Sequence, residues 1–138
     1  MVKAFNGRIL KAEGPFYQGP LESLIIPYRD GFLGIQAGHS NMICAIVPGQ
    51  MTWRVPGGQN QYAAVSHGFV KCEDGEVLIL CETIERPEEI DANRARSEQA
   101  RAKEIMLQKK SIQEYRLAEL EFARTANRLK VKHHQAGK

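Results

Sequence analysis

Glycine and proline divide this sequence into two parts that differ in the secondary structure they allow. From Glu88 to Lys132 neither residue occurs, whereas the preceding 86 residues carry one or both every several positions. These two residues interrupt helices and mark turns, so they exclude long helices from the first part and permit them in the second. We therefore predict two domains, residues 1–86 and residues 87–138.

Short apolar or alternating segments lie between the turn signals of the first domain and are typical of strands. They include residues 24–27, 42–47, 51–55, 61–65 and 76–82. Asp74-Gly75 stands between two of the apolar runs and predicts a hairpin, since glycine supplies the positive φ that tight hairpin turns need. Many short strands at regular spacing indicate a β-sandwich or a barrel.

The second domain is rich in Ala, Glu, Arg, Leu and Lys, which are good helix formers. Pro87, followed by Glu88, Glu89 and Asp91, favours a helix start near residues 88–91. A polar stretch at 108–111, with Ser111 as cap and Glu114 three residues later, predicts a turn and a second helix. Two helices joined by so short a connection run antiparallel, which makes the fold class α+β.

Each predicted helix has a thin apolar stripe made of residues three or four positions apart. The first stripe contains Ala92, Ala95, Ala102 and Met106, and the second contains Ile112, Tyr115, Phe122, Ala126 and Leu129. A two-helix hairpin buries little surface compared with its cost in conformational entropy. We therefore expect a hairpin that is marginally stable without a docking surface and that can open.

Charge is unevenly distributed between the two domains. Residues 1–86 carry seven Lys and Arg against eight Asp and Glu, a net charge of −1, while residues 87–138 carry twelve against eight, a net charge of +4. The basic second domain can meet an acidic protein surface, a phosphate or a nucleic acid. With a single Trp and 7% aromatic residues there is little for base stacking, so we expect no nucleic-acid partner.

The sequence lacks the motifs that would predict an enzyme or a metal site. It has no P-loop, no GxGxxG, no GxSxG and no CxxC pair, and the three cysteines Cys44, Cys72 and Cys81 suit neither a disulfide framework nor zinc. No apolar stretch near the start fits a secretory signal, and none approaches the length of a membrane span. We expect a non-catalytic protein that meets a membrane only through a complex.

Four motifs occur in an order that resembles the epsilon subunits of F-type rotary ATP synthases of the bacterial and chloroplast type. They are residues 30–39 (DGFLGIQAGH), Pro48-Gly49, residues 64–70 (AVSHGFV) and residues 90–95 (IDANRA). Together they cover nearly the whole chain. The sequence departs from that family at Gln36-Ala37, Ser40-Asn41 and His67, positions that bear on loop shape and partner contacts.

The resemblance implies an antiparallel β-sandwich of about ten strands that binds the gamma subunit and the rotor ring at the cytoplasmic face of the cell membrane, as a peripheral part of the complex. It places Gly31, Gly38, His39 and Ser40 in the loops that contact partners. It further implies that the helical tail inhibits ATP hydrolysis by extending toward the alpha/beta catalytic head. Coupling of ion translocation to ATP synthesis would be the role of the whole complex.

Four arginines of the second domain are spaced to present their guanidinium groups on helix faces. Arg94 and Arg101 are seven residues apart, about two turns, and Arg124 and Arg128 are four apart. A guanidinium fork matches phosphate oxygens, and in relatives that bind ATP this segment and the second helix form the site. The resemblance therefore implies a regulatory ATP, bound by these arginines with the carboxylates of Glu85 and Asp91, and no required cofactor.

A second interpretation of the same residues is structural. Asp91 with Arg94, Arg94 with Glu98, and Glu98 with Arg101 all have the spacing of helical salt bridges on a solvated face. The chain would then be a stalk clamp that couples the stalk to the ring without nucleotide sensing. Both interpretations remain open on the sequence alone.

Overall fold

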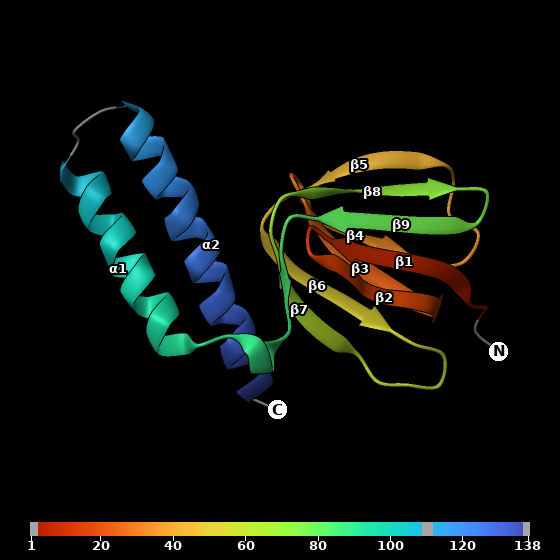
Figure 1. Cartoon of the computed structure of the whole chain (residues 1–138). Helices are drawn as coiled ribbons and strands as arrows, with labels where there is room; N and C mark the ends of the chain where they lie inside the picture. The colour runs from red at the N-terminus through yellow and green to blue at the C-terminus, as the bar shows by residue number, and fades with distance from the viewer. Residues whose placement is uncertain (1–2, 109–111, 137–138) are drawn as a thin grey trace. The chain divides into compact units, whose positions relative to one another are not determined.

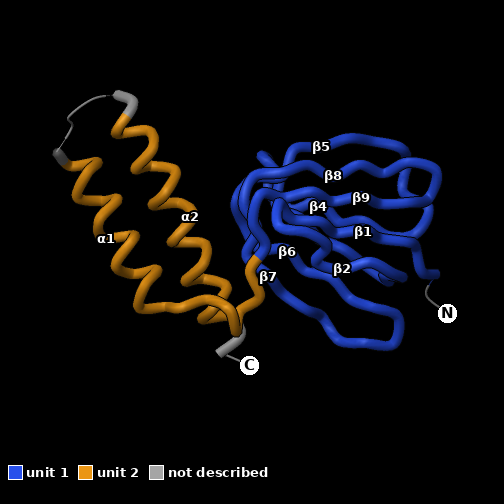
Figure 2. Tube along the Cα trace, in the orientation of Figure 1, with its two compact units in different colours: residues 1–84 blue, residues 85–138 orange. Residues whose placement is uncertain are grey.

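The structure, a computed structural model, describes residues 3–108 and 112–136. The chain forms two compact units, residues 1–84 and residues 85–138, which Figure 2 shows in different colours. The turn predicted near residues 108–111, with Ser111 as its cap, falls on positions that lie outside the described residues.

Unit 1 is built from strands alone, apart from its turns (Figure 1). Its strands are β1 (Phe5–Lys11), β2 (Gly14–Leu21), β3 (Ser23–Tyr28), β4 (Gly31–Ile35), β5 (Met42–Ile46), β6 (Gly49–Arg54), β7 (Gln61–Val65), β8 (Gly68–Glu73), β9 (Glu76–Cys81) and β10 (Ile84–Glu85), the last of which runs one residue past the unit boundary.

The strands form two five-stranded sheets, in the orders β2-β1-β9-β8-β5 and β10-β7-β6-β3-β4. Most neighbouring strands run antiparallel, whereas β1 and β9 run parallel, with Ile9 opposite Ile79. Inward-facing side chains of both sheets form one core, in which Leu24, Met51 and Trp53 are almost fully buried. The predicted ten-stranded sandwich followed by two helices is confirmed.

The hairpin predicted at Asp74-Gly75 joins β8 to β9, whose last pair is Glu73 opposite Glu76. Both loop residues have positive φ, 52° for Asp74 and 80° for Gly75. Two positive φ values in a two-residue loop are the property of a type I′ turn, whose twist matches the strands on either side.

Two Gly-Pro pairs, Gly14-Pro15 and Gly19-Pro20, lie inside strand β2 rather than between strands. This strand is at the edge of its sheet, where proline is tolerated because one side of the strand has no partner strand. Tyr17 contributes a local hydrogen bond, since its hydroxyl donates to the carbonyl oxygen of Pro20 at 2.6 Å. The edge position therefore overrides the usual effect of these residues.

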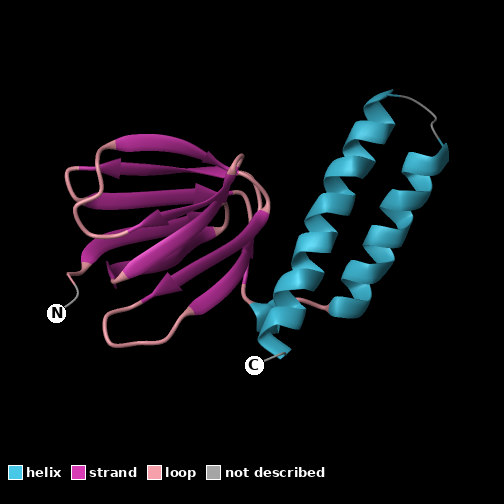
Figure 3. Ribbon diagram, turned by 180° about the vertical axis from the view of Figure 1, so that it is seen from behind, coloured by secondary structure: helices cyan, strands magenta, loops and turns pink. Residues whose placement is uncertain are grey.

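Unit 2 contains a 3₁₀ turn, η1 (Pro87–Glu89), and two α-helices, α1 (Ala92–Gln108) and α2 (Ile112–Ala136), which Figure 3 shows from behind. Asp91 caps α1, because its Oδ1 accepts from the backbone N–H of Arg94 at 3.1 Å. The α-helix thus begins just after the predicted range of residues 88–91, and Glu88 and Glu89 belong to η1 rather than to the first turn of α1.

The two helices pack against each other through small residues. Ala95 and Ala102 of α1 and Ala118 of α2 are almost fully buried, as predicted for the first two. The stripe predicted for α2 is only partly correct, because Tyr115 is 39% exposed whereas Thr125 is fully buried. The Thr125 hydroxyl is satisfied within its own helix by the carbonyl oxygens of Glu121 and Phe122, at 3.0 and 3.1 Å.

Candidate functional site

Arg128 lies at the centre of the ionic contacts of unit 2 and is the least exposed of the predicted ligands in these pairs, with 12% of its side chain accessible. Its Nη1 donates to Oε2 of Glu98 at 3.1 Å, which links α2 to α1. Its Nε lies 2.9 Å from Oε1 of Glu85, an ion pair by distance in which the N–H is not aimed at the oxygen for a hydrogen bond. Two of the predicted site residues, Glu85 and Arg128, are therefore in direct contact.

Arg94 joins the same network from the first helix. Its Nε donates to Oε1 of Glu98 at 3.0 Å, while its backbone N–H is held by the Asp91 cap. The Arg94 side chain is 73% exposed, so it can reorient toward a ligand with little loss of packing. In this conformation the Asp91 carboxylate accepts a hydrogen bond from the backbone at the start of α1.

Arg101 and Arg124 lie outside this direct network. Arg101 lines a groove of about 580 Å³ whose walls come from both helices, and Arg124 pairs with Glu121 one turn earlier on α2, with Nη2 2.6 Å from Oε2. Glu98 and Glu121 line the same groove as Arg101. The rest of the lining consists of Glu114 and the apolar residues Ala102, Ile105, Leu117 and Ala118.

Of the four predicted arginines, Arg101 lines this groove. Arg94 and Arg128 pair with Glu98, and Arg124 pairs with Glu121, and both carboxylates line the groove. The residues missed as members of the site include Glu98, Glu114 and Glu121, which line the groove. Lys132 was also missed, and its Nζ donates to the carbonyl oxygen of Pro87 at 3.2 Å. The spacing of Arg94 and Glu98 indicated their helical pair. No local pattern indicated the contact of Glu98 with Arg128, because these residues are thirty positions apart.

Of the residues predicted to contact partners, Gly31 begins strand β4, and Gly38, His39 and Ser40 lie in the loop between β4 and β5. Gly31 and Gly38 have φ values of 131° and 83°, a region that favours glycine. Nδ1 of His39 lies 2.9 Å from the carbonyl oxygen of Ser40. A carbonyl oxygen can only accept, so this ring nitrogen carries the proton and Nε2 is left for another contact.

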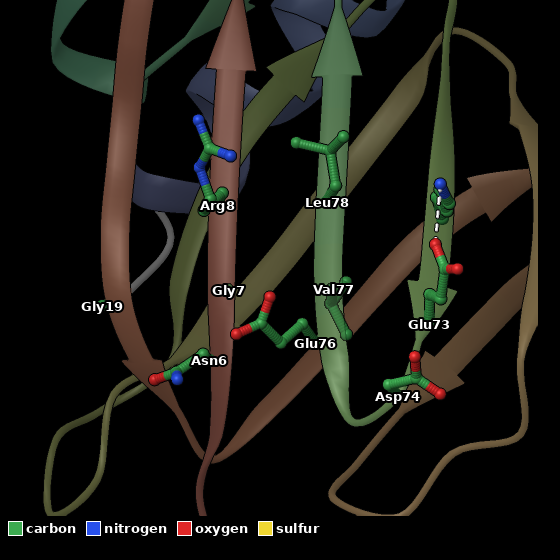
Figure 4. A pocket seen from close by; sticks show the side chains of 10 residues that line it. Asn6, Gly7, Arg8, Gly19, Glu73, Asp74, Glu76, Val77 and Leu78 are labelled. Carbon is green, nitrogen blue, oxygen red and sulfur yellow. Dashed lines mark ion pairs between the residues drawn. The ribbon is translucent and has the colours of Figure 1, made fainter.

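The sandwich carries a hollow of about 620 Å³ on the outer face of the sheet that contains β1 and β9 (Figure 4). Arg8 and Leu78 are paired across these strands. Lys71 forms an ion pair with Glu73 at 2.7 Å, and the hydrogen bond and charge of Glu73 raise the pKa of Lys71. This amine therefore stays a cation, and the lining of this hollow offers no other nucleophilic side chain.

The three cysteines are free, with Cys72 and Cys81 buried and Cys44 half-buried. Burial raises the pKa of Cys81 to about 12 and also raises the pKa of Cys72. Within residues 3–108 and 112–136, no three metal-ligating side chains gather into a group. In the same part of the chain, neither helix has the length and apolar character that crossing a bilayer requires.

Two family descriptions match the chain. "ATP synthase, Delta/Epsilon chain, beta-sandwich domain" matches residues 4–87, and "ATP synthase, Delta/Epsilon chain, long alpha-helix domain" matches residues 88–133. The ATP synthase epsilon chain of Ruminococcus albus is 38% identical over 128 residues, which cover 92% of this chain and 95% of that protein. The epsilon chain of Caldanaerobacter subterraneus is 36% identical over 131 residues, which cover 95% of both.

Two solved structures have the same fold at low sequence identity. A chain of the Euglena gracilis mitochondrial ATP synthase, in a structure of OSCP, F1 and c-ring, gives a TM-score of 0.81 at 20% identity, covering 98% of this chain and 82% of that one. A chain of the Tetrahymena thermophila mitochondrial ATP synthase central stalk and c-ring gives 0.62 at 13% identity, covering 92% and 95%. The family descriptions and curated relatives together show that this chain belongs to the epsilon-chain family of F-type ATP synthases.

Proposed function

We propose that this chain is a non-catalytic subunit of the central stalk of an F-type ATP synthase. In this role unit 1 binds the gamma subunit and the rotor ring, and unit 2 restrains ATP hydrolysis. The complex would stand at the cytoplasmic face of the cell membrane, where this subunit helps to couple ion translocation to ATP synthesis. The curated relatives are named ATP synthase epsilon chains, and one structural neighbour comes from a central stalk and c-ring assembly.

Exposed apolar side chains on unit 1 support protein partners for the sandwich. Phe32 and Ile43 are 62% and 73% exposed, and Ile25 and Leu80 are also accessible. Side chains of this size are costly to leave in water and are typical of contact surfaces when they lie near one another. Phe32 stands next to Gly31, one of the residues predicted to contact a partner.

The observation that carries the regulatory role is the construction of unit 2. It is a separate compact unit whose helices meet through alanines and through the ion pair of Glu98 with Arg128, and its exposed apolar residues include Leu107, Leu117 and Leu120. Such a hairpin has a small core and apolar surface suited to an alternative contact. Extended toward the alpha/beta head, the basic helix α2 would meet acidic protein surface.

The groove of unit 2 supports ATP as its regulatory ligand. Arg101 is already in the groove, and Arg94, Arg124 and Arg128 are held at or near it by Glu98 and Glu121. Guanidinium groups from two helices that converge on a bound triphosphate would hold the hairpin closed. In this proposal ATP favours the closed hairpin and thereby permits hydrolysis.

The structural clamp remains a second candidate, and one observation favours it. Arg94, Arg124 and Arg128 each have a carboxylate partner without any nucleotide. Ion pairs of this kind stabilise helices whether or not a ligand binds. The clamp keeps the stalk role and has neither inhibition nor sensing.

The regulatory role is tested by deleting residues 88–138 and reconstituting the synthase with the shortened chain. We expect ATP hydrolysis to rise relative to the full chain at equal incorporation. An unchanged rate would support the clamp. Calorimetric titration of ATP into the full chain, with Arg94→Ala and Arg124→Ala alongside, tests the ligand: saturable binding that both substitutions weaken is expected.

A further inference from the structure

One carboxylate, Glu98, holds a guanidinium group from each helix. Its Oε1 accepts from Arg94 on the same helix at 3.0 Å, and its Oε2 accepts from Arg128 on the other helix at 3.1 Å. The Glu98 side chain is 27% exposed, so these contacts are partly shielded from solvent. A phosphate oxygen that accepted from both guanidinium groups would use the same donors as Glu98.

Glu121 pairs with one arginine, Arg124, within helix α2. Nη2 of Arg124 lies 2.6 Å from Oε2 and 2.8 Å from Oε1 of Glu121, so both carboxylate oxygens face one nitrogen. Glu121 and Glu98 line the same groove, together with Arg101. Three of the four arginines are therefore paired with two of the three carboxylates that line the groove, the third being Glu114.

Carboxylate and phosphate oxygens compete for guanidinium groups because both are anionic acceptors that suit the same fork of donors. They cannot share one cation at short range without repulsion between the two anions. A triphosphate that enters the groove must therefore displace the carboxylates from the arginines or stay beside like charges. Either event lowers its affinity.

We propose that Glu98 and Glu121 are internal competitors for the phosphates of the nucleotide, an inference that rests on the proposed nucleotide site. Without nucleotide, Glu98 bridges Arg94 and Arg128 and keeps the two helices together. With nucleotide, the phosphates replace both carboxylates as acceptors. The two glutamates then set the nucleotide concentration at which the hairpin responds, and the arginines alone do not.

Isosteric glutamines provide the test, since Glu98→Gln and Glu121→Gln keep the side-chain size and one acceptor oxygen while removing the charge. The control is Glu119→Gln, which removes one negative charge from an exposed position of α2 outside the groove. ATP is titrated into each full-length chain by calorimetry at fixed ionic strength. Adenosine is titrated in parallel as a probe without phosphates.

We expect each groove variant to bind ATP about three- to tenfold more tightly than the unsubstituted chain, as expected for removing a nearby like charge. Adenosine affinity and the Glu119→Gln variant should show no such change. ATP binding to the groove variants but not to the original chain would also support the inference. The carboxylates would then be what excludes nucleotide from the original chain.

The inference and the proposed function fail in different ways. If the original chain binds ATP and both groove variants bind it equally or more weakly, the carboxylates position the arginines and do not compete; the nucleotide site then stands without this inference. If no chain binds ATP, both are overturned. Far-ultraviolet circular dichroism verifies helix content, and Glu121→Gln provides a test that leaves the cross-helix pair intact.

Discussion

Nη1 of Arg128 donates to Oε2 of Glu98 across the two helices of unit 2, over 3.1 Å and thirty residues of sequence. The same guanidinium contacts Glu85, close to the start of the unit. A single side chain of α2 therefore connects the entry segment, the first helix and the second helix. A ligand that binds Arg128 would therefore affect the contacts of the entry segment and of both helices.

Replacement of Arg128 with alanine should destabilise the closed hairpin. The substitution leaves Glu85 and Glu98, each 27% exposed, without this cation, and such loss costs about 1–3 kcal/mol. We expect a lower melting temperature of the helical signal in circular dichroism and faster amide hydrogen exchange in α1 and α2.

Arg124→Ala is the matched control for this prediction. Arg124 is 44% exposed and pairs with Glu121 within one helix, so its loss should cost less than about 1 kcal/mol. Both substitutions should weaken ATP binding, but only Arg128→Ala should loosen the hairpin. Equal effects on stability would contradict the central position assigned to Arg128.

The close approach of the helices should be sensitive to the size of Ala95, which is fully buried. Ala95→Leu adds three carbon atoms at a site without space, and overpacking of this kind costs about 1–3 kcal/mol. Ala100→Leu on the exposed side of the same helix should leave the melting temperature of unit 2 nearly unchanged. A larger effect at position 100 would show that helix propensity, rather than packing, limits this unit.

Local signals in the sequence were sufficient for much of this fold. The absence of Gly and Pro from Glu88 to Lys132 predicted the helices, because these two residues disfavour helical backbone directly. The Asp74-Gly75 turn was predictable for the same reason, since both of its φ values are positive. Membership of the family followed from motifs spread over both parts of the chain.

Contacts between distant residues were not predictable in the same way. The parallel pairing of β1 with β9 joins segments about seventy residues apart, and the pairing of Glu98 with Arg128 depends on the relative rotation of two helices. Thr125 was missed because a polar residue is not expected in an apolar stripe. It can be buried here because its hydroxyl donates to a carbonyl oxygen of its own helix. The ATP-binding role of the arginines stays a prediction.

Gly68 should be indispensable to the sandwich. A Cβ atom at this position would stand 2.8 Å from the Cα of Cys81 and closer still to the carbonyl oxygen of Leu80, both of them backbone atoms of the paired strand β9. Gly68→Ala should therefore cost about 3 kcal/mol or more in urea unfolding, or prevent folding. Gly34→Ala, where a Cβ meets no atom within 4 Å, should be nearly neutral. A stable Gly68→Ala chain would contradict the close strand contact.

Burial of the Cys81 thiol should make the sandwich less stable at alkaline pH. The pKa of Cys81 is raised to about 12 in the folded chain, above the ordinary value of 9.0. Above that ordinary value the unfolded chain releases the thiol proton while the folded chain keeps it, so the unfolded state binds fewer protons and stability falls as pH rises. The slope from this one group is at most about 1.4 kcal/mol per pH unit.

The test is urea unfolding of the original chain and of Cys81→Ala from about pH 8 to about pH 10.5. The difference between the two chains isolates the contribution of Cys81 to the free energy of unfolding, because other groups titrate equally in both. The advantage of the original chain over the variant should shrink steadily as pH rises. Cys72→Ala should show the same sign, since burial also raises the pKa of Cys72. A constant difference across this range would mean that Cys81 ionises as easily in the folded chain as in the unfolded one, which its 1% exposure in the core argues against.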